Sequence, residues 1–156
     1  MCWLCDHPEA TPADFSRLLR KRILKNRWAV MYVEDERRPF AYTIGLHNRG
    51  FAEYLVTGVP PERAMLLLNT VADYTIEEVQ PKPGDTMTIA DEVELEFTEV
   101  AQPDAHLCWA ANLYGPDVRA LQLVWRDERG HSPWCPDFDG GRGTQPVLGV
   151  RGPRAA

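Results

Sequence analysis

Hydrophobic and polar positions along the chain follow two periods, and the first of these is helical. Apolar residues recur at the spacing of an amphipathic helix in two long segments. The first segment begins at Thr11-Pro12, where Thr11 can cap the free backbone donors and Pro12 suits the first helical turn. The second begins at Pro61. Its expected buried stripe consists of Ala64, Met65, Leu68, Val71 and Ala72.

The second period is the two-residue alternation of a β-strand, with β-branched and aromatic residues. This alternation predicts strands at 28–33, 40–46, 53–58, 86–89, 93–100 and 119–126. Between the last two strands, we expect a short helix that is capped by Asp104 and runs through Leu113. The order of elements predicts an α+β fold, with one curved, mainly antiparallel sheet of about six strands and two or three helices.

The 156 residues are enough for one domain with a real core. We expect a Cys/His head over residues 1–10, an α+β body over 11–129, and an irregular Gly/Pro-rich tail over 130–156 that packs on the body. The formal net charge of −6 argues against a basic nucleic-acid-binding surface. No apolar run has the length of a membrane span, and a signal peptide is not evident. We therefore expect a cytoplasmic protein without nucleic-acid or membrane partners, and an unknown small ligand or protein as its partner.

Three side chains of metal-binding type lie in the first seven residues. The segment Cys2-x-x-Cys5-x-His7 offers two thiols and an imidazole, and a two-residue gap lets both thiolates reach one ion. Tetrahedral zinc needs four ligands, and Cys135 in the tail is the preferred fourth. His131 is the second choice for this position, and Cys108 follows last because it sits on an apolar helix pattern. The sequence thus predicts a zinc ion that fastens head to tail; iron is also compatible with these ligands.

Other interpretations of the head stay open. The two thiols could form a redox pair or have no special chemistry. Removal of Met1 would place the thiol of Cys2 beside a free α-amine, as in N-terminal-cysteine amidohydrolases. A site of Cys2, Cys5 and His7 alone would leave an open position, as in metalloenzymes. A non-catalytic interaction or regulatory module is the remaining class. Asp137 and Asp139 lack the spacing of a calcium-binding EF-hand.

A second group of polar residues lies on or next to the predicted strands and helices. These residues could line a pocket for a small ligand, but polar side chains on buried elements also need partners for structural reasons alone. The candidates are Tyr42, His47, Asn69, Gln122 and Asp127.

Short motifs in a fixed order carry a family resemblance. They are FAYTIGLH at 40–47, LVTGVP at 55–60, ALQLVW at 120–125, then Asp127, Gly130, Pro133-Trp134, Gln145-Pro146 and Leu148-Gly149. With these motifs the chain from about residue 28 to 148 resembles the bacterial domain-of-unknown-function 4262 family. The Cys-containing head is similar to a variant found in some members, so any chemistry of the head would belong to a subgroup. The resemblance itself implies no activity, cofactor or catalytic residue.

Overall fold

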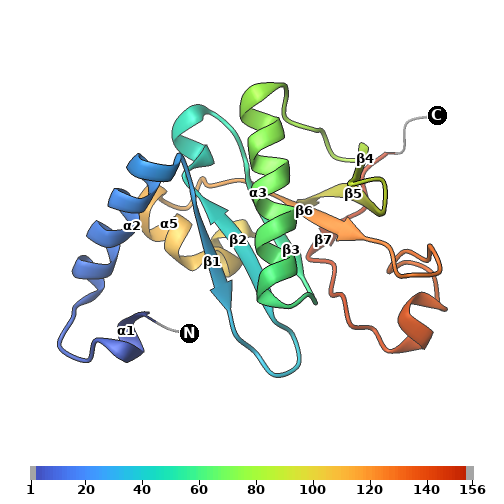
Figure 1. The fold of residues 1–156 in the computed structure, drawn as a ribbon, viewed down its shortest axis with the longest axis horizontal. Coiled ribbons are helices and arrows are strands. Elements are labelled where there is room, and N and C mark those ends of the chain that lie inside the picture. Colours follow the sequence, from blue (N-terminus) through green and yellow to red (C-terminus); the bar gives the residue numbers. More distant parts are fainter. Residues whose placement is uncertain (1–2, 154–156) are drawn as a thin grey trace.

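One mixed sheet organises residues 3–153, the part of the chain that the computed structural model describes (Figure 1). Its strands are β1 (Ala29–Val33), β2 (Phe40–Ile44), β3 (Glu53–Thr57), β4 (Thr86–Ile89), β5 (Val93–Val100), β6 (Ala120–Trp125) and β7 (Gly149–Val150). Their order is β1-β2-β3-β6-β5-β4, and β7 pairs with the end of β5. The pair of β3 and β6 is parallel, and the other pairs are antiparallel. The sheet is open. The predicted α+β class with a mainly antiparallel sheet is therefore confirmed.

Helices cover both faces of this sheet. The α-helices of the described chain are α1 (Trp3–Asp6), α2 (Pro12–Asn26), α3 (Pro61–Glu77), α4 (Pro103–His106) and α5 (Cys108–Tyr114), with 3-10 helices η1 (Leu46–Arg49) and η2 (Phe138–Gly141). Helix α3 packs on one face, where Leu68 meets Phe97 in the core. Helices α2 and α5 pack on the other face, where Leu19 and Ala110 share a core with Tyr42. Figure 1 shows α3 in front of the sheet and α5 behind it.

The two long helices begin where the sequence predicts. At α2 the hydroxyl of Thr11 accepts a hydrogen bond from the Asp14 N–H (3.2 Å), and the Asp14 carboxylate accepts one from the Thr11 N–H (2.8 Å). This reciprocal pair is a capping box. Helix α3 begins at Pro61, but one residue of its predicted buried stripe is wrong. Met65 is 50% exposed and Leu67 is buried in its place, because Met65 lies a full 100° around the helix from Ala64.

Other local predictions fail because tertiary contacts override sequence patterns. The helix expected from Asp104 to Leu113 is divided at Leu107, whose backbone is not helical (φ −90°, ψ 63°) and whose side chain is buried. Gln102 precedes α4 in the left-handed conformation, so Asp104 does not cap it. The head contains the short helix α1, and the tail, which was expected to be irregular, contributes β7 to the sheet. None of the helices in residues 3–153 is both long and apolar enough to cross a membrane.

Side-chain amides fix the tail against the sheet. Gln145 acts as a strand partner of Trp125: its Oε1 accepts from the Trp125 N–H (2.9 Å) and its Nε2 donates to the Trp125 carbonyl (2.8 Å). Gln122, fully buried on β6, donates to the Pro146 carbonyl (2.8 Å) and accepts from the Leu148 N–H (2.9 Å). The segment from 126 to 144 is therefore a loop that is held to β6 at both ends.

Candidate metal site

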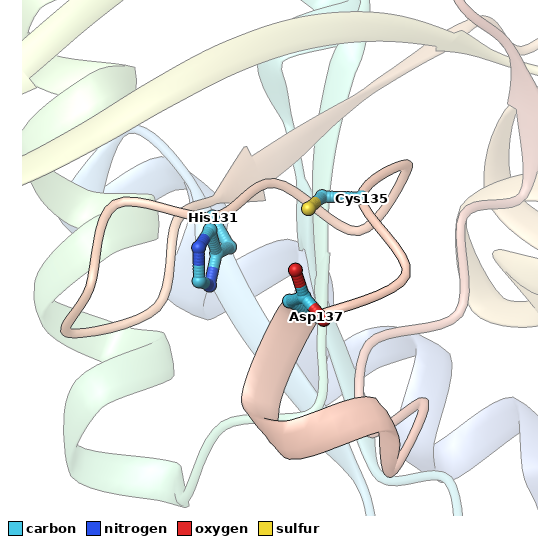
Figure 2. Close-up of side chains that lie close together, drawn as sticks. All are labelled: His131, Cys135 and Asp137. Atoms are coloured by element: carbon cyan, nitrogen blue, oxygen red, sulfur yellow. The ribbon is translucent and has the colours of Figure 1, made fainter.

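Three side chains of metal-binding type converge in this loop. His131, Cys135 and Asp137 place one ligand atom each within 4.8 Å of one another. Figure 2 shows the imidazole, the thiol and the carboxylate around a common space. Short turns produce this convergence: the Cys135 N–H donates to the Ser132 carbonyl (2.9 Å), and the Phe138 N–H donates to the Cys135 carbonyl (3.1 Å). One nitrogen, one sulfur and one oxygen donor thus face each other across a short span of the chain.

Asp127 holds the start of this loop and contacts the imidazole. Its carboxylate accepts hydrogen bonds from the N–H groups of His131 (2.8 Å), Asp139 (2.9 Å) and Arg129 (3.0 Å). Burial by itself would raise the pKa of Asp127, but these three donors hold its pKa below the ordinary value. Its Oδ2 also lies 3.4 Å from His131 Nδ1, a buried atom to which the described residues offer no aligned hydrogen bond. The Asp127 carboxylate therefore lies beside the His131 ring, close to Nδ1 but without a hydrogen bond to it.

Aromatic and ionic contacts fix the rest of the loop. Phe138 is buried against Trp125, with ring centroids 5.3 Å apart. The guanidinium of Arg151 lies over Trp134, 4.1 Å from the ring centroid. The same guanidinium makes two 2.9 Å contacts with the largely buried carboxylate of Glu96 on β5. These contacts tie the loop to the sheet and limit the movement of the three candidate ligands.

The ligands predicted in the head lie elsewhere. Cys2 is outside the described residues. Cys5 and His7 are exposed, on and just after α1, which lies at one end of the long axis, whereas the loop of residues 131–142 lies at the other end (Figure 1). The structure therefore does not bring Cys5 or His7 next to Cys135. Cys108 is exposed at the start of α5, and its thiol lies 3.8 Å from the Ala105 carbonyl.

The residues expected to line a ligand pocket do not gather in one place. The Tyr42 hydroxyl accepts a hydrogen bond from the Trp109 N–H (3.1 Å) on the α5 side of the sheet, and burial raises the pKa of this phenol above its ordinary value. Asn69, on α3 at the opposite face, accepts one from Trp28 Nε1 (2.8 Å). Gln122 donates a hydrogen bond to the tail, and Asp127 accepts one within the loop of residues 126–144, called the metal-site loop below. Structural hydrogen bonding thus accounts for these polar groups.

His47 leads to a buried carboxylate that the sequence analysis missed. The imidazole stacks on Tyr114 with ring centroids 4.8 Å apart. The His47 N–H donates to Glu53 (3.1 Å), as do the N–H groups of Gly45 (3.0 Å) and Leu46 (3.2 Å) and the hydroxyl of Thr43 (2.9 Å). Glu53 is fully buried, and burial raises its pKa to about 7 against the opposing effect of these donors. The available signal was an acidic residue at the start of a strand that is otherwise apolar.

Asp137 was also missed as a ligand, although it lies two residues after Cys135. The signal in this case is the spacing His-x-x-x-Cys-x-Asp in a segment rich in turn-forming residues, which allows three short-range ligands to converge without any contribution from the head.

The family model described as a domain of unknown function (DUF4262) matches residues 22–139, from within α2 to η2. The match covers more than half of the chain and contains all three converging side chains. The head lies outside it. Neither a curated protein nor a solved structure matches the chain.

Proposed function

The chain belongs to the DUF4262 family, and we propose that this member binds a zinc ion through His131, Cys135 and Asp137. The observation that carries this proposal is the convergence of their ligand atoms within 4.8 Å. Nitrogen, thiolate sulfur and carboxylate oxygen are the donors that zinc takes in proteins. The proposed zinc site therefore belongs to the tail loop, with the ligands supplied by one short segment.

The distances are compatible with a small closing movement. Around a tetrahedral zinc ion with bonds of about 2.0 to 2.3 Å, neighbouring ligand atoms are roughly 3 to 4 Å apart. The three ligand atoms lie within 4.8 Å of one another, so the separations between them would have to shorten by about 1 Å to bind the ion. Asp137 is the exposed member of the set, so rotation of its side chain can supply this contraction while the partly buried His131 and Cys135 stay in place.

Asp127 would act as a positioning residue for such an ion. A histidine that binds a metal usually gives its second ring nitrogen to a carboxylate or a carbonyl group, which fixes the orientation of the ring. Asp127 Oδ2 lies 3.4 Å from His131 Nδ1 without an aligned hydrogen bond, so we propose that a small rotation of the ring on metal binding would complete this contact and leave Nε2 for the ion. Three protein ligands would leave a fourth position for water, which is the arrangement of an open zinc site.

Metal content provides the test. Tag-free protein purified without chelators would be analysed by elemental mass spectrometry, and metal-free protein would then be titrated with Zn²⁺ and Co²⁺. We expect one equivalent of zinc, and a Co²⁺ complex with a sulfur-to-metal charge-transfer band. Cys135→Ala should abolish both results. The matched controls Cys5→Ala and Cys108→Ala should leave both unchanged, because these thiols lie away from the loop.

Two results would overturn this assignment. If Cys5→Ala abolished binding and Cys135→Ala did not, the ion would belong to the head. If the wild-type protein bound no equivalent of zinc or cobalt, the loop would have no metal function. The Asp127→Asn variant separates positioning from ligation: it should weaken zinc binding by about 10- to 100-fold without removing the charge-transfer band.

A further inference from the structure

A cavity of about 510 Å³ lies beside the metal-site loop, between that loop and the start of α3. Four arginines contribute to its wall: Arg63, Arg126, Arg129 and Arg142. This concentration of guanidinium groups is unusual for a chain with a formal net charge of −6. The volume of the cavity lies within the usual range for small-molecule sites, which is about 300 to 1,000 Å³.

Two of the four arginines have acidic partners within the protein. Arg142 donates to the carboxylate of Asp139 (2.9 Å) and to its backbone carbonyl (2.9 Å). Arg126 lies 3.4 Å from Glu94, at the neighbouring position on β5. The charges of these two side chains are thus largely balanced before any ligand arrives.

The other two, Arg63 and Arg129, make no ion pair with any acidic side chain in residues 3–153. Arg63 instead lies over the indole of Trp125, with its guanidinium carbon 5.9 Å from the ring centroid. A guanidinium stacked in this way keeps its N–H groups available for an anion.

The acidic residues of the wall do not neutralise Arg63 and Arg129, because two of these acids have other partners. The Asp127 carboxylate is occupied by three backbone N–H groups and faces His131. Asp139 is occupied by Arg142 and by the hydroxyl of Thr144 (2.8 Å). The third acid, Glu128 in the turn after β6, is exposed, as are Arg63 and Arg129, and it forms no ion pair with either of them in residues 3–153. The cavity therefore presents two guanidinium groups against which the described part of the chain fixes no carboxylate.

The backbone at the start of α3 adds N–H donors, which carry a partial positive charge. Helix α3 begins at Pro61 and follows Pro60, and its first turn has no side-chain cap among the described residues. The N–H group of Arg63, which lines the cavity, belongs to this turn and has no partner inside the helix, whereas the acidic Glu62 of the same turn is exposed and does not line the cavity. Because the helix dipole makes this end positive, the first turn favours a bound anion. Val59 and the Trp125 ring supply an apolar part of the same wall.

From this combination we propose that the cavity binds a small phosphate ester, with the phosphate held by Arg63, Arg129 and the first turn of α3. Guanidinium groups and helix N-termini both match the geometry of phosphate oxygens. The organic part of the ester would lie on Trp125 and Val59. None of the three proposed metal ligands contributes to the wall of the cavity, although Asp127, which lies next to His131, does.

Calorimetric titration of metal-free protein tests this proposal without reference to zinc. Inorganic phosphate and phenyl phosphate would be added at constant ionic strength, with phenol as the uncharged comparison. We expect saturable binding of one equivalent of phenyl phosphate, weaker binding of inorganic phosphate because it lacks the ring, and none of phenol. The Arg63→Gln/Arg129→Gln double variant should weaken binding by about tenfold or more. The double Lys variant should keep part of the affinity, because it retains the charge.

The control is Arg20→Gln, an exposed arginine on α2 at the far end of the molecule (Figure 1). It should leave both dissociation constants within about twofold of the wild-type values. The proposal fails if phenyl phosphate shows no saturable binding up to about 10 mM. It also fails if Arg20→Gln weakens binding as much as the double variant does, since binding would then reflect general charge rather than this cavity.

Discussion

Replacement of Glu53 by glutamine should remove a pH-dependent part of the protein's stability. The folded protein raises the pKa of this buried carboxyl from its ordinary 4.5 to about 7, chiefly through burial. At a pH between these two pKa values, Glu53 keeps its proton in the folded protein, whereas it has released the proton in the unfolded chain. The free energy of unfolding must therefore decrease as the pH rises from about 4.5 to about 7, and it loses no more above that range.

The size of this effect follows from the two pKa values. A pKa of about 7 instead of 4.5 corresponds to a loss of about 3 kcal/mol across the interval. A glutamine side chain does not ionise, so the Glu53→Gln variant lacks this loss. Its amide NH₂, placed at the Oε1 position, would face Thr43, which can accept, and Leu46, whose N–H would lose its acceptor. One unpaired buried donor costs about 1 to 3 kcal/mol.

The stability of Glu53→Gln relative to the wild type should therefore rise with pH. Urea unfolding at pH 5, 6, 7 and 8, followed by circular dichroism, measures both curves. We expect Glu53→Gln to be less stable at pH 5 and to match or exceed the wild type at pH 8. The exposed Glu92→Gln in the β4–β5 turn serves as the control and should leave the pH profile unchanged. Parallel profiles for the wild type and Glu53→Gln would refute the reasoning.

Four further substitutions test the packing of the fold. Leu67→Ala should lower the free energy of unfolding by about 2 to 5 kcal/mol, whereas Met65→Ala, on the exposed side of α3, should lower it by less than about 1 kcal/mol in the same urea assay. Gly149→Ala would drive a Cβ into the Glu99 carbonyl oxygen, so we expect β7 to leave β5 and the β7 amides to exchange faster with deuterium; unchanged exchange would contradict this. Gln122→Ala removes the acceptor of the Leu148 N–H and one of the two donors to the Pro146 carbonyl, which keeps the Thr57 hydroxyl, so it should cost about 1 to 3 kcal/mol and open the tail to limited proteolysis, which a wild-type digestion pattern would disprove.

Elements defined by local patterns could be predicted from the sequence. Strands β4 and β5 have the predicted limits, because Val93, Leu95 and Phe97 alternate with polar residues along a half-buried strand. The start of α2 follows from Thr11 and its N3 partner Asp14. The division between α4 and α5 could not be predicted in this way, since it depends on the burial of Leu107 in the core with α2.

The candidate sites depend on contacts that sequence spacing does not reveal. The nearness of His131, Cys135 and Asp137 requires the turns that Asp127 stabilises through the Asp139 N–H, twelve residues further along the chain. The burial of Glu53 requires donors from the connection between β2 and β3. The head offered a stronger local spacing of ligand types, and for that reason the sequence analysis favoured it.

The location of both candidate sites follows from the topology of the sheet. Strands β3 and β6 run parallel, so their carboxyl ends, Thr57 and Trp125, reach the same edge, and the Trp125 indole N–H donates to the Thr57 carbonyl there (2.9 Å). Helix α3 starts after β3 and the loop of residues 126–144 starts after β6, so a positive helix end and the proposed metal ligands lie at the same edge of the sheet. Open sheets commonly bind ligands outside the carboxyl ends of parallel strands. Asp127 takes part in both proposed sites, since it lines the cavity and its carboxylate lies 3.4 Å from His131 Nδ1. A ligand in the cavity and an ion in the loop would therefore act on the same carboxylate, and each should alter the affinity for the other by an equal factor.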